Sequence, residues 1–199
     1  GTPWSLSNPL TGLPGGGLPG EAAAAAASGT ASGVDAAPVP EDARIHPLDL
    51  GLLRPESDPR SRIAYRVEAG QGISDWSLAA PAGEAAPTSC ALALRRRLDL
   101  GQAAGFYIQA RSSEELRYLV ELRSGDRWYY ASFRLPAGAW TWTRVPLDRF
   151  YRVMRSRERP PLAGVDSLFV SVSSFTLAAP LSGRLEIAAA GFYGGPAPE

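Results

Sequence analysis

The fold is decided by residues 127–150, which read RWYYASFRLPAGAWTWTRVPLDRF. Two runs in this stretch, residues 128–135 and 140–147, alternate apolar and polar side chains, and a Pro-Ala-Gly turn at 136–138 separates them. A period of two predicts β-strands that each bury one face. One side of this predicted sheet carries four aromatic residues, Trp128, Tyr130, Trp140 and Trp142. That side is either a second packed layer or an exposed binding platform.

The same period continues on both sides of this stretch. From Ile63 onward, short alternating runs follow one another, and Ser124-Gly-Asp126 predicts a tight hairpin before residue 127. A long run from Ser89 to Leu100 is interrupted by Arg96, which marks a bulge, an edge or an inward-pointing charge. Roughly eight or nine short strands without a sustained helical segment predict an all-β fold, an antiparallel β-sandwich.

Composition divides the chain into two parts. Residues 1–60 contain nine Gly and nine Pro, and Trp4 is their only aromatic residue. This content is typical of low-complexity segments that cannot bury enough apolar surface to fold alone. Residues 61–199 hold most of the large apolar side chains and all but one of the aromatic residues, and their length is that of one ordinary domain. We therefore expect an arm or linker at 1–60 and a β-sandwich domain at 61–199.

The charges argue against several partners. The net charge is zero, with −4 in residues 1–60 and +4 in residues 61–199, which is no concentrated basic surface for nucleic acid. All twenty basic residues are Arg, as expected for a GC-rich bacterial genome. No apolar run approaches the roughly 18 residues that span a bilayer. A single cysteine, Cys90, lies in an apolar strand pattern and predicts a small buried side chain rather than a disulfide or metal site.

The sequence offers little catalytic chemistry. His46, the only histidine, lies in the predicted arm, where it is poorly placed to act as a general base. A glycosidase needs two facing carboxylates. Glu121 paired with Asp126 or Glu186 is conceivable, but nothing in the spacing demands it. We expect no enzyme, no cofactor and no metal.

The order of features resembles a known fold family. The Val145-Pro-Leu-x-x-Phe150 element after a Trp-rich strand, and the last strand ending in Gly191-Phe-Tyr193, are similar to galactose-binding-like jelly rolls. Within that group the chain looks most like complex I intermediate-associated proteins and related carbohydrate-binding modules. The resemblance covers residues 63–194. It departs from the pattern in an Arg-rich segment at 149–159 and in lacking an acidic cluster for the calcium ion that many jelly rolls carry.

Two surfaces are candidates for binding. Aromatic faces bind the C–H faces of sugar rings while polar neighbours bind the hydroxyl groups. The first candidate combines the four aromatic residues above with Tyr107, Gln109, Arg111 and Arg134, although packing would also explain these rings. The second would contact a protein partner through the arm and the Arg-rich segment, at Trp4, Arg149, Arg152 and Arg155.

Two functions follow from these surfaces. The first is a non-catalytic accessory or assembly subunit that docks on a larger protein complex through the arm and the sandwich, without a transmembrane segment of its own. The alternative is a secreted carbohydrate-binding module that stacks polysaccharide on exposed aromatic rings. Both readings predict a bacterial protein that is either exported or associated with a membrane complex through its partners.

Overall fold

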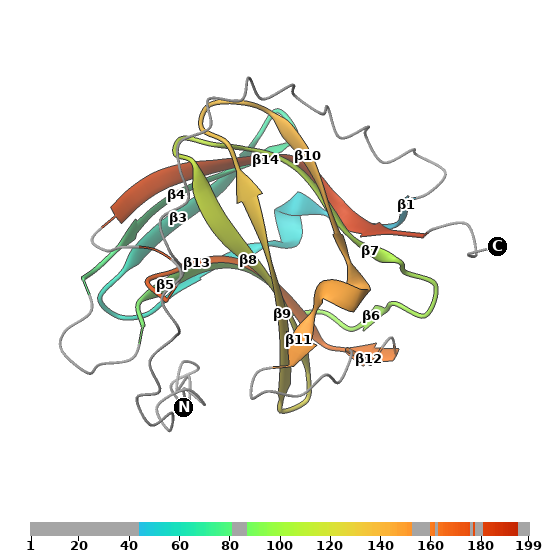
Figure 1. The fold of residues 1–199 in the computed structure, drawn as a ribbon. Coiled ribbons are helices and arrows are strands. Elements are labelled where there is room, and N and C mark those ends of the chain that lie inside the picture. The colour runs from blue at the N-terminus through green and yellow to red at the C-terminus, as the bar shows by residue number, and fades with distance from the viewer. Residues whose placement is uncertain are drawn as a thin grey trace, which may run out of the picture.

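The chain folds almost entirely into antiparallel strands. A computed structural model describes residues 44–80, 87–152, 160–161, 163–175, 177 and 181–194, and within them it contains fourteen strands and two short 3-10 helices. Twelve of the strands form two six-stranded sheets that pack face to face (Figure 1). The predicted all-β sandwich is therefore confirmed. No helix among the described residues is long and apolar enough to cross a membrane.

The first sheet, here called sheet A, has the strand order β10-β7-β14-β4-β3. Its last strand, β14, is long enough to pair with β4 along its first half and with β1 near its end. The bounds are β1 Arg44–Pro47, β3 Arg62–Glu68, β4 Gln71–Leu78, β7 Gly105–Ser112, β10 Thr141–Pro146 and β14 Leu181–Tyr193. The β3–β4 hairpin turns through Ala69 and Gly70, both at positive φ, as in the tight turns that match strand twist.

The second sheet, sheet B, has the order β11-β9-β8-β13-β5-β2. Its strands are β2 Arg54–Ser57, β5 Ser89–Leu94, β8 Leu116–Ser124, β9 Arg127–Leu135, β11 Tyr151–Arg152 and β13 Ser167–Ser173. The predicted hairpin joins β8 to β9 through Gly125 and Asp126, with Gly125 at a φ of 61°. A small separate pair joins β6 Leu98–Asp99 to β12 Ala163–Val165. The helices are η2 Leu50–Leu52 and η3 Leu147–Arg149.

The core lies between the two sheets. Alternate residues of each strand point inward, so Phe106 and Ile108 of β7 meet Tyr118 and Val120 of β8 in one apolar cluster. The buried Tyr118 hydroxyl lies 2.8 Å from Ser112 Oγ, which satisfies both polar groups inside the core. Cys90 is buried in this cluster as expected, and burial raises the pKa of its thiol to about 11. One continuous core therefore holds both sheets in a single domain.

The structure corrects two expectations about the layout. Residues 44–57, assigned to the arm, contribute β1 and β2, which pair with the last strand of sheet A and with β5 of sheet B. The sandwich thus begins before residue 61, because this segment pairs with strands of both sheets and contributes Leu50 and Leu53 to the core. The predicted long strand from Ser89 to Leu100 ends at Leu94, and three exposed arginines, Arg95, Arg96 and Arg97, separate β5 from β6.

A third correction concerns the stretch that decides the fold. Both predicted strands exist, but β9 pairs with β8 in sheet B whereas β10 pairs with β7 in sheet A. The segment between them crosses from one sheet to the other, with Gly138 at a φ of 74° and its N–H donating to the Ser112 carbonyl at 2.8 Å. The four aromatic residues expected on one side therefore lie on opposite outer faces of the sandwich.

Candidate functional site

The outer face of sheet B is organised in rows that run across the strands. Directly paired residues of antiparallel strands project to the same side of a sheet. The central row crosses all six strands and contains Tyr151, Tyr130, Glu121, Phe169, Ala93 and Arg54. The next row contains Ser132, Leu119, Ser171, Ala91 and Glu56. This face thus carries aromatic side chains at the β9–β11 edge, Glu121 and Phe169 in the middle, and alanines on β5.

Part of this outer face is apolar and closely packed. Phe169 is fully buried although it points away from the core, and it clusters with Ala91 and Ala93. The Trp128 ring packs on it, with the centroids 5.2 Å apart and a tilt of 32°. The Arg95 guanidinium lies 5.3 Å from the centroid of the same ring. The face is therefore built around a second, smaller hydrophobic cluster rather than being a simple solvated surface.

Arg95 is held in place by an acid on the neighbouring strand. Its Nε and Nη2 donate to the two carboxylate oxygens of Glu56, each at 2.8 Å, in a bidentate pair. This hydrogen bonding raises the pKa of Arg95. The charge of Arg95 is thus matched by Glu56, and its guanidinium plane is oriented over Phe169.

The rings at the β9–β11 edge are partly accessible. Trp128 and Tyr130 are half-buried, and Tyr151 is 57% exposed. Arg123 lies 5.6 Å from the Trp128 ring and donates through Nε to the Gly125 carbonyl at 2.7 Å. Figure 1 shows β13 and β14 bent in the same direction, so that the outer face of sheet B lies on the concave side of the sandwich.

Glu121 lies in the middle of the central row, between Tyr130 and Phe169. Ser171 Oγ donates to its Oε2 at 2.8 Å, and it makes no other hydrogen bond or ion pair with the described residues. Burial raises the pKa of the Glu121 carboxyl, and the hydrogen bond from Ser171 opposes that shift only in part. The side chain nevertheless remains partly accessible. This face therefore presents a desolvated carboxyl group beside aromatic rings.

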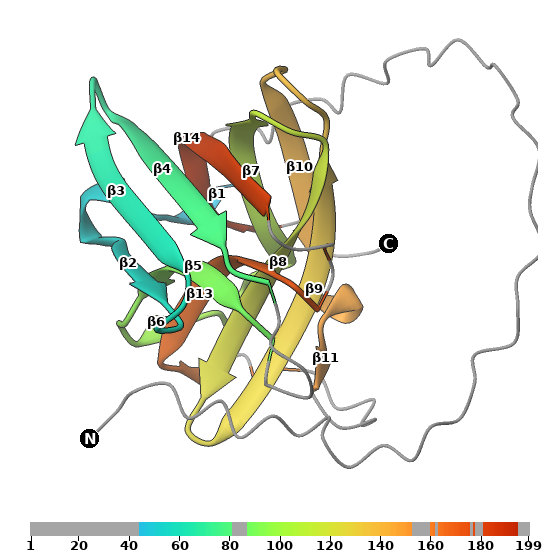
Figure 2. The same cartoon turned by 90° about the vertical axis from the view of Figure 1, so that its left-hand side faces the viewer.

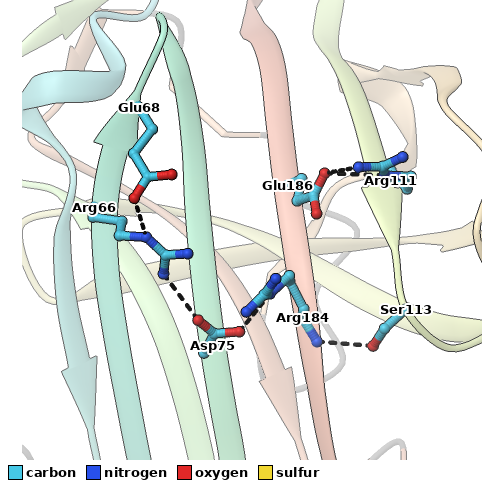
Figure 3. A network of polar contacts seen from close by, with 7 residues as sticks. All are labelled: Arg66, Glu68, Asp75, Arg111, Ser113, Arg184 and Glu186. Atoms are coloured by element: carbon cyan, nitrogen blue, oxygen red, sulfur yellow. Dashed lines mark hydrogen bonds and ion pairs between the residues drawn. The ribbon is translucent and has the colours of Figure 1, made fainter.

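The outer face of sheet A is different, because its charges pair with one another. Asp75 accepts from Arg184 Nε at 2.6 Å and from Arg66 Nη1 at 3.0 Å, and Arg66 also donates to Glu68 at 2.6 Å. Figure 3 shows this network running across β3, β4 and β14. The hydrogen bond from Arg184 lowers the pKa of Asp75, as does the weaker one from Arg66, while burial opposes them.

The aromatic residues of sheet A are likewise occupied. Trp140 is 37% exposed, but the Arg111 guanidinium lies 5.1 Å from its ring centroid and also pairs with Glu186. Tyr107 is only 1% exposed and lies 6.1 Å from the Trp142 ring. The rings on this face therefore pack against their own neighbours.

The predicted binding residues divide between the two faces. Sheet B holds Trp128, Tyr130 and Arg134, and Arg134 pairs with Glu115 at 3.2 Å. Sheet A and the segment leading into it hold Tyr107, Gln109, Arg111, Trp140 and Trp142. Arg149 ends η3 and Arg152 belongs to β11, whereas Trp4 and Arg155 lie outside the described residues. The expected single platform of eight residues is therefore not formed.

Several residues of the sheet-B face were not predicted as binding residues. For Phe169, the available signal in the sequence was a large apolar residue at an outward position between Ser167 and Ser171. Tyr151 and Arg95 could not be placed without the strand pairings. Glu121 was considered only as one of a catalytic pair, but Glu186 lies on the opposite outer face, so these two carboxylates do not face each other.

The part of the chain that the structure describes offers no candidate metal site. No group of three or more His, Cys, Asp or Glu side chains in this part of the chain is placed to hold a metal ion. An open surface pocket lies beside β2, β3 and β4. Its lining includes Ser57, Ser61, Arg62 and Asp75, and it contains no cluster of metal-ligating side chains.

Comparison with known proteins identifies the fold. No protein-family model and no curated protein matches the sequence. A family 11 carbohydrate-binding module from Clostridium thermocellum, solved with a β-1,3-1,4-mixed-linked tetrasaccharide, superposes with a TM-score of 0.55 at 14% identity. That match covers 75% of this chain and 95% of the module. The solution structure of CtCBM11 gives a TM-score of 0.55 at 13% identity, covering 81% of this chain and 99% of that one.

A larger protein contains a similar domain. The structure of PfGH50B matches with a TM-score of 0.56 at 10% identity, and the match covers 77% of this chain. The chain spans about a quarter of that protein, with 24% of it covered. At these identities the likeness defines the fold alone: the chain is a jelly-roll β-sandwich of the type found in carbohydrate-binding modules. This agrees with the fold that the sequence resemblance implied.

Proposed function

We propose that this protein is a non-catalytic polysaccharide-binding module whose ligand lies on the outer face of sheet B. The observation that carries the proposal is the central row of that face, in which Tyr151, Tyr130 and the partly accessible Glu121 lie side by side. Aromatic rings offer apolar contact to sugar C–H faces, and a carboxylate accepts hydrogen bonds from hydroxyl groups. The row places both kinds of group on neighbouring strands.

The concave shape of the sheet-B face supports it over the sheet-A face, and so does Glu121, whose carboxylate has no ion-pair partner among the described residues. On sheet A, the charged side chains satisfy one another and Arg111 lies over Trp140. A ligand there would have to break several charge-assisted hydrogen bonds before making its own. On sheet B, the arginine nearest the middle of the face, Arg95, is already matched by Glu56 and leaves Glu121 unpaired among the described residues.

The proposal also favours one of the two functions expected from the sequence. Solved structures of the same fold are carbohydrate-binding modules, which supports polysaccharide binding over docking on a protein complex. The assembly-subunit reading depends on Trp4 and Arg155, which lie outside the described residues. Because polysaccharides of this kind occur outside the cell, we expect an exported protein.

A binding role without hydrolysis fits the placement of the acids. Glycosidases use two carboxyl groups on either side of the scissile bond, roughly 5–10 Å apart. Among the described residues, Glu121 and Glu186 lie on opposite faces, and Asp126 lies in the β8–β9 turn. The residues of the sheet-B face therefore suit recognition of a sugar chain rather than its cleavage.

The test is affinity electrophoresis with soluble polysaccharides, beginning with mixed-linkage β-1,3-1,4-glucan and neutral galactans. Tyr130→Ala is the informative variant, because Tyr130 has no ring contact among the described residues and its loss should leave the fold intact. We expect about tenfold weaker binding or more, as for removal of a central aromatic contact.

Trp142→Ala serves as the matched control on sheet A and should bind like the wild type. If Trp142→Ala loses binding and Tyr130→Ala keeps it, the ligand binds sheet A and the assignment is wrong. If no neutral polysaccharide retards the wild-type chain, the proposed function itself fails.

A further inference from the structure

The surroundings of the Glu121 carboxyl, in the middle of the sheet-B face, do not favour the stability of the fold. Glu121 is desolvated, receives one hydrogen bond and faces no cation at ion-pair distance among the described residues. A buried or half-buried acid without a paired cation costs stability, and a neutral residue of similar shape would avoid that cost. The presence of an acid at position 121 is therefore not explained by the stability of the sandwich, and a role in binding would explain it.

The neighbours of Glu121 define its electrostatic surroundings. Phe169 and Ser171 of β13 face it with no charge, and Tyr130 faces it from β9. The charged and titratable groups on the same face are Arg54 and Glu56 on β2, Arg95 after β5, Glu115 before β8, Arg117 and Arg123 on β8, Tyr130 and Arg134 on β9 and Tyr151 on β11.

The nearest arginines are directed to other partners. Arg95 pairs with Glu56, Arg123 donates to the Gly125 carbonyl, and Arg54 donates to the Gly51 and Leu53 carbonyls at 2.7 and 2.9 Å. Each of these arginines thus has a partner other than Glu121, and none of the three makes a hydrogen bond or ion pair with the Glu121 carboxylate. The middle of this face consequently presents one acid with unused acceptor capacity, flanked by an aromatic ring on each side.

We infer that Glu121 is the specificity-determining group of the polysaccharide site, and that its ionised carboxylate accepts hydrogen bonds from adjacent hydroxyl groups of a neutral sugar chain and releases the chain when it is protonated. This inference rests on the proposed function, and it adds the class of ligand and a response to pH. A carboxylate can accept two hydroxyl donors at once, which suits a sugar ring with neighbouring hydroxyls.

The same charge discriminates between classes of polysaccharide. A uronate or sulfate group placed over the central row would bring a second negative charge to the partly desolvated Glu121. Neutral glucans and galactans bring only hydroxyl donors and acceptors. The ligand is therefore expected to be an uncharged polysaccharide.

Burial couples this recognition to pH. Because the pKa of the Glu121 carboxyl is raised, a fraction of the groups becomes protonated above the range in which ordinary carboxyls titrate. A ligand that binds the ionised form then binds more weakly as the pH falls through that raised pKa. Ser171 favours the ionised form, so its removal should move the transition to higher pH.

The experiment measures the affinity of the full chain for mixed-linkage β-glucan, by isothermal titration between about pH 4 and pH 8. Wild-type affinity should fall on the acidic side, by up to about tenfold per pH unit below the transition. Glu121→Gln should bind about ten- to a hundredfold more weakly at neutral pH, with a flat profile. Ser171→Ala should shift the transition upward, and Glu114→Gln, in an exposed turn, should behave as wild type.

Three outcomes would overturn the inference. The first is an affinity of Glu121→Gln equal to that of the wild type while Tyr130→Ala still loses binding, which leaves the proposed function standing. The second is tighter binding of polygalacturonate than of the neutral glucan. The third is no binding of any polysaccharide by the wild type at any pH, in which case both the function and the inference fail.

A stability measurement separates recognition from a structural role. An acid with a raised folded-state pKa is most favourable when protonated, and stability is lost as the pH rises through that pKa. Glu121→Gln should therefore be more stable than the wild type at neutral pH, and this advantage should disappear in acid. A Glu121→Gln variant that is less stable at neutral pH would show that the charged carboxyl supports the fold, contrary to the inference.

Discussion

The two outer faces of this sandwich differ in how their charged side chains are paired. Sheet A neutralises its exposed charges internally, through the Arg66, Asp75 and Arg184 network that Figure 3 shows. Sheet B instead packs Phe169 into a small apolar cluster and leaves Glu121 with one hydrogen bond from Ser171. The difference teaches that a carboxylate without a paired cation marks a candidate binding face more clearly than the number of charged or aromatic residues does.

The two faces also differ in where their accessible aromatic rings lie. Figure 2 shows the sandwich from the side, with β3 and β4 of sheet A and β5, β13 and β8 of sheet B. Near the end of β14, β1 pairs with it as a further strand of sheet A, and Tyr107 packs beside Gly191. Sheet B carries its accessible rings at the opposite outer surface, where β9 meets β11.

The largest expected effect concerns the apolar cluster of sheet B. Phe169→Ala should lower the free energy of unfolding by about 3–5 kcal/mol, because it removes a fully buried ring that Trp128 and Arg95 cover. Phe175→Ala is the control, since Phe175 is 60% exposed and should change stability by no more than about 0.5 kcal/mol. Urea denaturation measures both. Equal effects of the two variants would show that the outer cluster does not stabilise the fold.

An intermediate effect is expected where β1 pairs with the end of β14. A Cβ atom at Gly191 would overlap the His46 carbonyl oxygen and the Tyr107 hydroxyl, so Gly191→Ala must displace β1 or the tyrosine. Such overpacking costs about 1–3 kcal/mol. Thermal unfolding should show the loss, whereas Gly101→Ala, in an exposed turn, should change little.

Polysaccharide affinity of Gly191→Ala, measured well below its melting temperature, should match that of the wild type. Weakened binding would mean that the two faces are coupled through the core, which contradicts their separation.

The smallest expected effect concerns the ion pairs of sheet A. Asp75→Asn should reduce stability at neutral pH by less than about 1 kcal/mol, because exposed ion pairs contribute little and are screened by salt. The pKa of Asp75 is lowered, so its contribution is present above the unfolded-state pKa and lost as the pH falls through the folded-state pKa. Denaturation at neutral and strongly acidic pH should therefore show a difference only at neutral pH. A loss that persists in acid or in high salt would mean that Asp75 acts through packing.

Much of the fold could be predicted from local pattern. The alternation in residues 128–135 and 140–147 correctly predicted β9 and β10, and Ser124-Gly-Asp126 correctly predicted the β8–β9 hairpin. These features depend on neighbours in sequence, whose spacing sets which side chains share a face. The boundary at residue 60 was misplaced because the Gly and Pro content was averaged over residues 1–60, whereas residues 44–57 pair with distant strands and contribute Leu50 and Leu53 to the core.

The candidate site could be predicted only in part. Tyr130 and Trp128 were identified from their alternation, but Trp140 and Trp142 were grouped with them because the two runs are adjacent in sequence. A tight turn and a crossing between sheets can contain the same turn-forming residues. Whether the second strand returns to the same sheet or crosses to the other depends on which strand has an unpaired edge and on which apolar face the second strand can bury. Both depend on residues far away in the sequence.

By itself, the sequence determined that the chain builds strands with one buried face, because a period of two is a property of the backbone and needs no partner. Only the tertiary structure decided which strands share a sheet, and hence that Glu121, Tyr130 and Tyr151 lie in one row while Trp142 and Glu186 lie behind them on the far face. The physical reason is that strand pairing joins residues far apart in the chain. Every backbone has the same hydrogen-bonding groups, so the local sequence does not specify which strand becomes the partner.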